Sequence, residues 1–539
     1  MTTLRALSAA FAAALLVAGC SVNLDGAPCR EAGTTRDCPG GQACGNDLRC
    51  SARALACAGS RCTPGEGGAC LDPEGLPSGV DRARRCTDAD RVCGSWELEP
   101  CAANGFVCGL RSGAARCECP EYAGTVVVAG PAGSPSRDGY PYPRGQESPR
   151  LCRFGKLGDA LDAAGAHTAA ATVRIEGEAG AAVVFGAATG EAFPLRVGSN
   201  VTVLAAPAPA GPSVIRGAPG AATLVVVQGA AEGLRVEAGG ATGTGVSLSC
   251  GASGAPSLRQ VAVDGGGVVL DPDGAVTAGL SAGVVVGGTC GARLTGVGVE
   301  AVAGPALSIE PASAATVEVL GGRFGGSRVG IRLLGGKVTV GTDPESAASV
   351  AVAGNAGVGV AVGPGTGSGT VLDATLDGLT IAGNGGAGVV VGGLASTSKV
   401  RILRCDVRGN GEVSPAWSGL LADGVRRVGG VLVANLALAT FSFHGNRLWS
   451  NAGDQLAFDS GATFSIAPES ATCGPDSNVF AWLAEGDLAL RQVGPGWVGA
   501  SYNAWPGYPA RAYYAGNVDA PSSDACSTEP GLPPWPSAP

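Results

Sequence analysis

The stretch Val352-Ala-Gly-Asn355 contains a short phrase that recurs along the second half of the chain. It returns as Ile381-Ala-Gly-Asn384, Val407-Arg-Gly-Asn410 and Phe443-His-Gly-Asn446, and the related Leu448-Trp-Ser-Asn451 follows the last copy. The steps between the first four asparagines are 29, 26 and 36 residues. Repeats of roughly 20 to 50 residues indicate a solenoid, in which each unit packs only on its neighbours.

Short alternating strands surround these phrases, as in Gly233-Leu-Arg-Val-Glu237, Thr316-Val-Glu-Val319 and Val400-Arg-Ile-Leu403. The units have no helical spacing, so we expect coils of parallel strands. The pattern resembles the right-handed parallel β-helix family, the fold of pectate lyases and many bacterial surface proteins, over roughly residues 120 to 465. The predicted fold class is all-β: a right-handed parallel β-helix solenoid with a short capping helix, preceded by a small disulfide-rich module.

The repeated asparagines are expected at one turn of successive coils. Asparagine tolerates a left-handed backbone, and its side-chain amide forms local hydrogen bonds. Amides stacked at the same turn can also form a hydrogen-bonded ladder. The predicted structural ladder consists of Asn355, Asn384, Asn410, Asn446 and Asn451.

The composition excludes some classes of partner. The chain has 539 residues, a net charge of -9 and only 15% charged residues, which gives no reason to expect a nucleic acid. Gly383-Asn-Gly385-Gly-Ala-Gly388 fits the dinucleotide pattern, but a strand-like Val389-Val-Val391 follows where a helix should receive the phosphates. We therefore expect no nucleotide and no other cofactor.

The N-terminus has the features of an export signal. Arg5 precedes an apolar run, Ala6 to Ala18, that is too short to span a membrane. The run ends Leu16-Val-Ala-Gly-Cys20, which resembles the bacterial lipobox and implies cleavage before Cys20 and its lipidation. Ser21 follows in place of aspartate, which implies delivery to the outer membrane of a Gram-negative bacterium. The alternative is an ordinary signal peptide followed by a cysteine with no special role.

Thirteen of the 20 cysteines lie between Cys29 and Cys119. Few apolar residues separate them, so disulfides rather than a core must hold this module, which is similar to small extracellular knots such as EGF-like domains. Zinc is the competing interpretation, but the block has no C-x-x-C pair and no histidine, so no metal is expected. Two further bridges are predicted, Cys250 with Cys290 one coil apart, and Cys473 with Cys526.

The expected domain boundaries follow these changes in composition. They are a signal peptide over 1–20, a tether over 21–28, the cysteine module over 29–119, the β-helix with its N-terminal cap over 120–465, and an aromatic C-terminal cap with a proline-rich tail over 466–539. The C-terminal aromatics are predicted to cover the last coil, and a platform for sugar rings is the alternative.

Candidate catalytic residues are weak. Gly279-Leu-Ser281-Ala-Gly283 fits the nucleophile-elbow pattern, but strand-like residues follow it, and the chain has only two histidines, His167 and His444. Lysis or glycoside hydrolysis needs acidic groups, with an arginine or lysine base for lysis. The best cluster is Asp264, Asp271 and Asp273 with Arg259, and a second one is Asp373 and Asp377 with Arg401 and Arg404. Both sets also suit ordinary solvated turns and faces.

Two functions remain from the sequence. The favoured one is a non-enzymatic, lipid-anchored surface protein whose rigid β-helix contacts a polysaccharide or a surface protein. The alternative is a polysaccharide-active enzyme, a lyase or a glycoside hydrolase, on the same scaffold. Acidic residues and an arginine from three neighbouring coils that converge in one groove would favour the enzyme.

Overall fold

The protein is described here from a computed structural model. The structure describes residues 152–505, except 167–168, 178–179, 206–210, 251–253, 268–278, 290, 312–314, 364–370, 412–418, 421–426, 435–437, 460, 469, 471, 482–486 and 494, and it also describes 514–519 and 526. N-terminal to these it describes residues 30, 43–44, 50–51, 61–62, 68–71, 82–87, 94–99, 101, 107–111, 114–118, 126–129 and 140–141. The signal sequence, Cys20, His167, Asp271, Asp273 and Cys290 lie outside the described residues.

The chain forms two compact units. The first comprises residues 1–120 and 143–150, and the second comprises 121–142 and 151–539. The described strands of the first unit pair in antiparallel fashion and are β1 (Ala43–Cys44), β2 (Cys50–Ser51), β3 (Arg61–Cys62), β4 (Ala69–Leu71), β5 (Arg82–Thr87), β6 (Gly94–Glu99), β7 (Val107–Arg111) and β8 (Ala114–Glu118). A disulfide joins Cys70 to Cys108, with their Cα atoms 5.4 Å apart.

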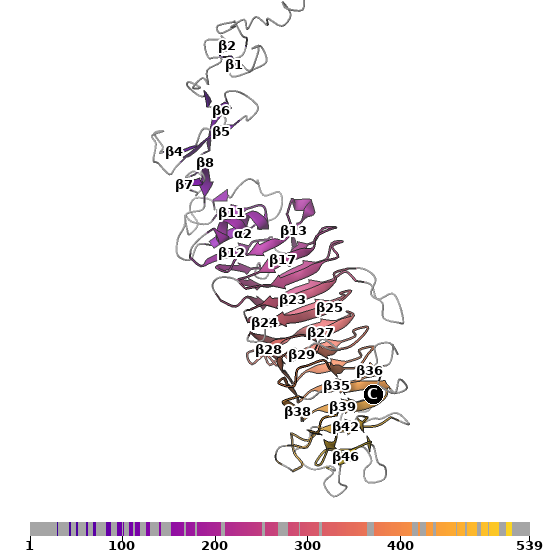
Figure 1. The fold of residues 1–539 in the computed structure, drawn as a ribbon. Helices are drawn as coiled ribbons and strands as arrows, with labels where there is room; N and C mark the ends of the chain where they lie inside the picture. Colours follow the sequence, from indigo (N-terminus) through magenta and orange to yellow (C-terminus); the bar gives the residue numbers. More distant parts are fainter. Residues whose placement is uncertain are drawn as a thin grey trace, which may run out of the picture. The chain divides into compact units, whose positions relative to one another are not determined.

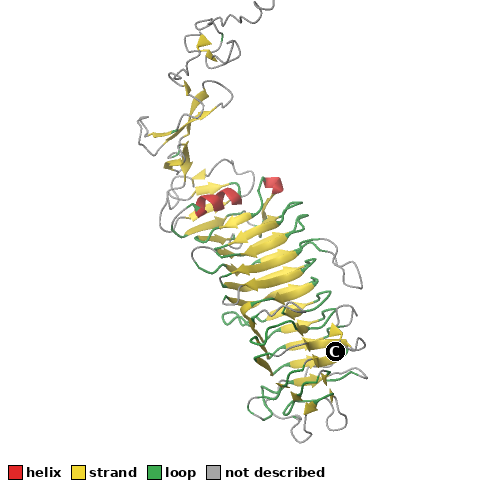
Figure 2. Cartoon of the chain, in the orientation of Figure 1, coloured by secondary structure: helices red, strands yellow, loops and turns green. Residues whose placement is uncertain are grey.

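The second unit is a right-handed parallel β-helix, as predicted, with three strands in each coil (Figures 1 and 2). We name the three strand faces A, B and C in the order in which each coil visits them. Face A is formed by β9 (Val126–Ala129), β12 (Ala171–Ile175), β15 (Val201–Leu204), β18 (Ala230–Glu232), β21 (Ser257–Arg259), the first halves of β24 (Ala292–Glu300) and β26 (Thr316–Gly325), β28 (Gly336–Gly341), β31 (Leu372–Asp377), β34 (Lys399–Leu403) and β38 (Thr440–His444).

Face B carries the candidate site, and in most coils it follows face A after a short turn. Its strands are β13 (Val183–Gly186), β16 (Ser213–Arg216), β19 (Leu234–Glu237), β22 (Ala262–Asp264), the second halves of β24 and β26, β29 (Val350–Ala353), β32 (Thr380–Ala382), β35 (Asp406–Arg408), β39 (Arg447–Trp449) and β42 (Val479–Ala481). β24 and β26 run continuously around the corner between the two faces, which is why faces A and B belong to one 22-stranded sheet.

Face C is a separate 13-stranded sheet. Its strands are β14 (Leu195–Val197), β17 (Thr223–Val227), β20 (Thr244–Leu248), β23 (Ala282–Gly288), β25 (Pro305–Pro311), β27 (Val329–Leu333), β30 (Val360–Val362), β33 (Val389–Val391), β37 (Arg427–Ala434), β40 (Asp454–Asp459), β43 (Leu490–Gln492) and β45 (Tyr514–Ala515), with β36 (Gly419–Leu420) antiparallel to β37. Parallel pairing therefore continues beyond residue 465.

Valine, leucine and isoleucine fill the interior in rows that run from coil to coil. On face A, for example, Leu258, Leu294 and Val319 are paired in register on successive strands, and each is at most 1% exposed. Side chains alternate between inside and outside along each strand, so every second residue faces solvent. Because burying one such aliphatic side chain is worth about 1.5–3 kcal/mol, the stack gains stability with each coil.

The predicted capping helix is present as α2 (Leu157–Gly165). It buries Leu157, Ala160, Leu161 and Ala164 against the first coils and contacts β11 (Cys152–Phe154), which pairs with β10 (Tyr140–Pro141). A 3₁₀ turn, η2 (Ala187–Thr189), follows β13. Within the described part of the chain, no helix combines the length and apolar character needed to cross a membrane.

Two asparagine ladders stabilise the turns, where the sequence suggested one. Between faces B and C, Asn355, Asn384, Asn410 and Asn451 are stacked, and the side-chain oxygen of each asparagine from Asn384 onward accepts hydrogen bonds from both the backbone N–H and the side-chain amide of the preceding one. Asn446 belongs to a second ladder, between faces A and B, with Asn478 and Asn503. The reason for the split is that Asn446 precedes β39, whereas Asn451 follows it.

The left-handed residue in each phrase is the glycine and not the asparagine. Gly383, for example, has a φ of +61°, and Ser450 takes the same conformation, with a φ of +51°, where the phrase lacks glycine. Asparagine therefore occupies its position for its side-chain hydrogen bonds, and glycine precedes it because a Cβ atom is unfavourable at positive φ.

In the C-terminal region, Trp505 and Tyr514 pack against the hydrophobic core of the β-helix unit. Trp505 is 6% exposed and stacks on Phe480, with ring centroids 4.8 Å apart. Cys473 and Cys526 form a disulfide beside this cluster. The short strands β41 (Phe464–Ser465), β44 (Val498–Gly499) and β46 (Val518–Asp519) form a separate three-stranded sheet in this region. Among the tryptophans of this unit whose side chains are described, Trp497 is the strongly exposed one, at 44%.

Candidate functional site

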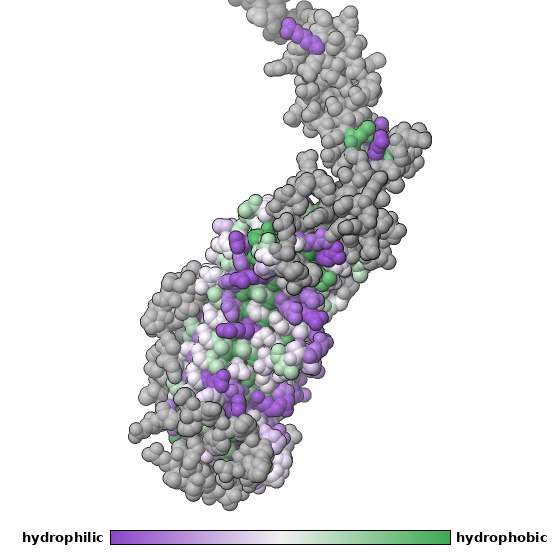
Figure 3. Space-filling view, turned by 180° about the vertical axis from the view of Figure 1, so that it is seen from behind, coloured by the Kyte–Doolittle hydropathy of each residue, from purple (hydrophilic) through white to green (hydrophobic). Residues whose placement is uncertain are grey.

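Charged side chains gather in register on the outer surface of face B. Glu237, Asp264 and Glu300 are paired positions on three successive strands, and Arg216 precedes them in the same row. Neighbouring strands are about 4.8 Å apart, so the three carboxylates form a continuous line, which we call the carboxylate row. The adjacent outward row supplies Arg235, from the strand that carries Glu237. Figure 3 shows one side of the unit, on which hydrophilic residues gather in separate patches.

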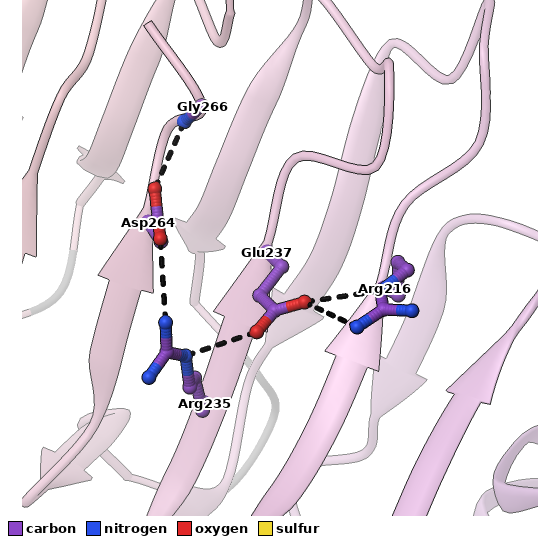
Figure 4. Close-up of polar contacts among 5 residues, drawn as sticks. All are labelled: Arg216, Arg235, Glu237, Asp264 and Gly266. Atoms are coloured by element: carbon purple, nitrogen blue, oxygen red, sulfur yellow. Dashed lines mark hydrogen bonds and ion pairs between the residues drawn. The ribbon is translucent and has the colours of Figure 1, made fainter.

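Arginines connect the members of the carboxylate row (Figure 4). Arg216 places Nη2 at 2.9 Å from Oε2 of Glu237, and Arg235 bridges Glu237 at 3.1 Å and Asp264 at 3.3 Å. The other oxygen of Asp264 accepts the backbone N–H of Gly266 at 3.0 Å. Arg323 lies 3.4 Å from Glu300. Three arginines thus match three carboxylates, and the group as a whole is neutral.

Asp264 therefore lies in a multi-coil cluster that does not include Arg259; its other suggested partners, Asp271 and Asp273, lie outside the described residues. Arg259 lies on face A, on the other side of the corner at Gln260, and its nearest ionic partners are Glu232 and Glu345, each at 3.9 Å. Arg235 and Glu237 could not be predicted as partners of Asp264 from the sequence. Their register with Asp264 depends on which residues between the strands loop out of the coil.

The second predicted cluster consists of two ion pairs on face A. Arg401 places Nη1 at 2.7 Å from Oδ1 of Asp373 and at 3.3 Å from the hydroxyl of Thr375. Arg404 contacts Asp377. Arg401 lies on β34 and Arg404 directly follows that strand, so both pairs connect β31 to the next coil. Each carboxylate of this cluster thus forms an ion pair with an arginine of the next coil. These pairs therefore have a structural role as contacts between coils.

A further cluster occupies the C-terminal end of face B, and the sequence analysis did not single it out. Asp406 accepts hydrogen bonds from the indole N–H of Trp449 at 2.7 Å and from Arg447 at 3.2 Å, and it lies 3.3 Å from Arg408. The guanidinium of Arg408 lies over the indole of Trp449, 5.2 Å from the ring centroid. We call these four residues the arginine–tryptophan cluster. Arg408 and Trp449 occupy the same place in their phrases, and this common position is the signal that could have predicted their pairing.

The structure also has a cavity of about 400 Å³ beside the start of α2, lined in part by Lys156, Asp159, Asp162, Glu191 and Arg196. Glu191 accepts the backbone N–H groups of Leu157 at 2.6 Å and Gly158 at 3.0 Å. Burial raises the pKa of Glu191 above its ordinary value, although these hydrogen bonds act against the shift. The carboxylate serves α2 as an N-terminal cap, which is a structural role.

The remaining sequence motifs have structural positions. Ser281 donates from its hydroxyl to the carbonyl of Gly243 at 3.2 Å, and His444 ends β38 on face A, so no nucleophile and base are brought together there. Strands β32 and β33 flank the glycine-rich phrase at Gly383, which excludes the strand-to-helix turn that nucleotide binding needs. Among the described residues, no three side chains of histidine, cysteine, aspartate or glutamate are grouped to hold a metal ion.

The cysteines of the β-helix unit occupy different environments. Cys250 is disulfide-bonded and lies beside Thr289, with its sulfur 3.7 Å from the threonine hydroxyl, while its predicted partner Cys290 lies outside the described residues. Cys405 is a buried free thiol at the turn between faces A and B, and burial raises its pKa to about 12. Cys405 donates its backbone N–H to Asn446, so it occupies a ladder position and has no reactive character.

No family model matches this chain, and no curated protein matches its sequence. Two solved structures have a similar parallel β-helix fold, the A-modules of mannuronan C-5 epimerases AlgE6 and AlgE4 from Azotobacter vinelandii. The AlgE6 match has 15% identity, a TM-score of 0.33, and covers 64% of this chain and 97% of that module. The AlgE4 match has 14% identity, a TM-score of 0.31, and covers 67% of this chain and 95% of the module. A likeness of this size assigns no chemistry to the chain.

Proposed function

We propose that this chain is an exported, lipid-anchored surface protein that binds polysaccharide through face B without cleaving it. The lipobox-like sequence ending at Cys20 supports the anchor, and the cysteine-rich module supports an oxidising compartment. The single observation that carries the binding role is the carboxylate row with its arginines, a line of charged groups shared by consecutive coils.

The geometry of this line suits an extended polar chain. Its side chains project from strands of a continuous parallel sheet, and the ion pairs hold the guanidinium and carboxylate groups in fixed positions. Sugar hydroxyls both donate and accept hydrogen bonds, and charged groups make the stronger partners for them. Because the groups are positioned before the ligand arrives, less side-chain entropy is lost on binding.

Catalysis is the second candidate, because the carboxylates of three neighbouring coils do line up with arginines. Hydrolysis needs one carboxyl group that carries a proton and donates it to the leaving oxygen. Glu237 and Asp264 are both in ion pairs with Arg235, so each of these carboxyl groups already has a cationic partner. The ion-paired arrangement therefore favours binding.

The test separates the two candidates directly. The chain from Ser21 to Pro539, with its disulfides formed, is incubated with pectins, alginates and glycosaminoglycans, with and without calcium. We expect retention of at least one polymer in affinity electrophoresis and no change in polymer size by chromatography. Shortened polymers, abolished by Asp264→Asn, would instead establish the enzyme.

The anchor is tested in cells. We expect the native chain in the membrane fraction with a lipid-modified Cys20 by mass spectrometry, and the Cys20→Ser variant in the soluble exported fraction. An unmodified Cys20 on a membrane-free protein would refute the lipoprotein assignment.

A further inference from the structure

We propose that the arginine–tryptophan cluster at the C-terminal end of face B is a subsite for the carboxylate of a uronic acid residue in an acidic polysaccharide. This inference rests on the proposed polysaccharide-binding function and deepens it, because it names the class of sugar and the side chains that recognise it. Four observations support it: the charge of the cluster, its preorganisation, its aromatic surface and the small side chains beside it.

The charge of this cluster differs from that of the carboxylate row. Two arginines, Arg408 and Arg447, share the single carboxylate of Asp406, so the cluster carries one net positive charge. The carboxylate row is neutral, since three arginines match its three acids, and the whole chain has a net charge of -9. A local positive excess on an otherwise acidic chain attracts an anionic group.

The cluster is held in place before any ligand binds. Asp406 is only 13% exposed and accepts from Trp449 and Arg447, which come from the next coil. Arg408 uses one nitrogen for Asp406, while its side chain is 42% exposed. A guanidinium has five N–H donors in a planar fork that matches a carboxylate, so Arg408 can hold Asp406 and still offer donors to a ligand.

Trp449 supplies an apolar surface beside these donors. Its indole N–H is fixed by Asp406, and the stacked guanidinium of Arg408 limits the motion of the ring. The indole is partly exposed, and aromatic rings provide contact area for the C–H surface of a pyranose. A sugar carrying a carboxylate uses both features at once, whereas a simple inorganic anion would use only the arginine.

On the N-terminal side of the cluster, the outward positions of face B carry small side chains. Thr380 and Ala382 are the register partners of Asp406 and Arg408, and Ala351 and Ala353 precede them on the next strand. These small side chains are not themselves a site, and among the described residues of face B they place no bulky group beside Arg408 on this side. On the C-terminal side, Val479 and Ala481 of β42 are 1% exposed and thus already covered. An extended sugar chain can therefore reach the cluster along face B from one direction.

The experiment measures binding of two oligosaccharides that differ only in charge, by calorimetry on the chain from Ser21 to Pro539. One is an oligogalacturonate, and the other is its fully methyl-esterified form. We expect the acid to bind, binding to weaken with added salt, and the ester to bind at least about tenfold more weakly. Arg408→Gln should lower affinity for the acid about tenfold or more. Arg293→Gln, which removes a similarly exposed arginine from face A, should not.

A second readout guards against a variant that fails to fold. Titration of the native chain with oligogalacturonate should change tryptophan fluorescence, and Trp449→Phe should remove most of that change while leaving the thermal unfolding midpoint in place. Trp497→Phe is the matched control, since Trp497 is exposed outside face B.

The outcomes distinguish this inference from the function on which it rests. Binding of the acid that is unaffected by Arg408→Gln would overturn the subsite and leave polysaccharide binding intact. Equal affinity for the ester, or for a sulfated polymer without carboxylates, would overturn the assignment to uronates. If neither these oligosaccharides nor any neutral polymer binds, the proposed function and the subsite fail together.

Discussion

Single residues in this chain have roles that their type alone does not reveal. The asparagine after each glycine recurs at the same position of successive coils because its side chain makes four hydrogen bonds. The side-chain oxygen of Asn410, for example, accepts from the backbone N–H and the side-chain amide of Asn384. Its side-chain amide donates to Asn451 and to the carbonyl of Ile381. It is fully buried, so no water can replace a lost partner. Removing one such side chain therefore affects two coils.

We predict that Asn410→Ala lowers the free energy of unfolding by about 2–4 kcal/mol, because it leaves buried donors of Asn384 without an acceptor. Urea unfolding followed by circular dichroism measures the loss. Thr380→Ala, a change to an outward residue of the preceding coil, is the control and should cost under about 0.5 kcal/mol. A loss no larger for Asn410→Ala than for the control would mean that the ladder contributes nothing to stability.

Glu191 predicts a pH dependence. Burial raises its folded-state pKa above the ordinary value of 4.5, so between the two values the folded chain holds more protons than the unfolded one. The contribution of this group to the free energy of unfolding therefore falls as pH rises through that window and is least favourable above it. Carbon-13 NMR of labelled glutamates, assigned with Glu191→Gln, should give a midpoint above 4.5. A midpoint at or below 4.5 would contradict the burial argument.

At the scale of strands and turns, much of the fold could be predicted and the site could not. The phrases with glycine and asparagine predict parallel coils because glycine permits the backbone conformation of the turn and asparagine provides its side-chain hydrogen bonds. They do not specify the turn of the coil in which they lie, so the sequence alone predicts one ladder for both Asn446 and Asn451. The register between strands is also unknown from the sequence. Glu237, Asp264 and Glu300 are neighbours only because the connections between their strands, which differ in length, loop out of the regular coil. Proximity in the sequence predicts Arg259 as the partner of Asp264. The corner at Gln260, however, places these two residues on different faces.

The disulfide between Cys473 and Cys526 predicts local behaviour at the end of the stack. It closes 53 residues of sequence separation beside Val479 and Ala504, which it helps to keep buried. Replacing both cysteines with alanine should lower the stability of this end by up to about 4 kcal/mol, through the added freedom of the unfolded segment.

Hydrogen exchange measures this loss residue by residue. Amides of β42 should exchange faster in the double variant, whereas amides of β28, in the middle of the stack, should not change. Uniform acceleration throughout the unit would show instead that the stack unfolds as a whole.

At the scale of the whole molecule, most of the described ionic contacts are exposed pairs between neighbouring coils, such as Arg293 with Glu318 and Arg332 with Glu310. Exposed pairs of this kind contribute about 0–1 kcal/mol each and are screened by salt. Stability rests mainly on the aliphatic rows and the asparagine ladders, whereas charge is available for recognition.

The chain should therefore separate stability from binding in its response to salt. Raising sodium chloride from about 0.05 M to about 0.5 M should change the free energy of unfolding by less than about 2 kcal/mol. Over the same range the affinity for an acidic oligosaccharide should fall by about tenfold or more, because the attraction between exposed charges is screened. Parallel urea titrations and calorimetry test this. A stability change as large as the affinity change would show that the ion pairs support the fold.

A glutamine ends the ladder between faces B and C, and this has a consequence for the number of coils that such a chain can contain. The last side-chain amide, that of Asn451, donates to Oε1 of Gln455 in its own coil, which supplies the acceptor that a further asparagine would otherwise provide. Every internal asparagine has identical demands, and an identical neighbour meets them. Duplication or deletion of one whole coil therefore leaves each remaining rung complete, as long as the terminating glutamine is kept. A lineage of such genes can vary the reach of the protein without redesigning its interior.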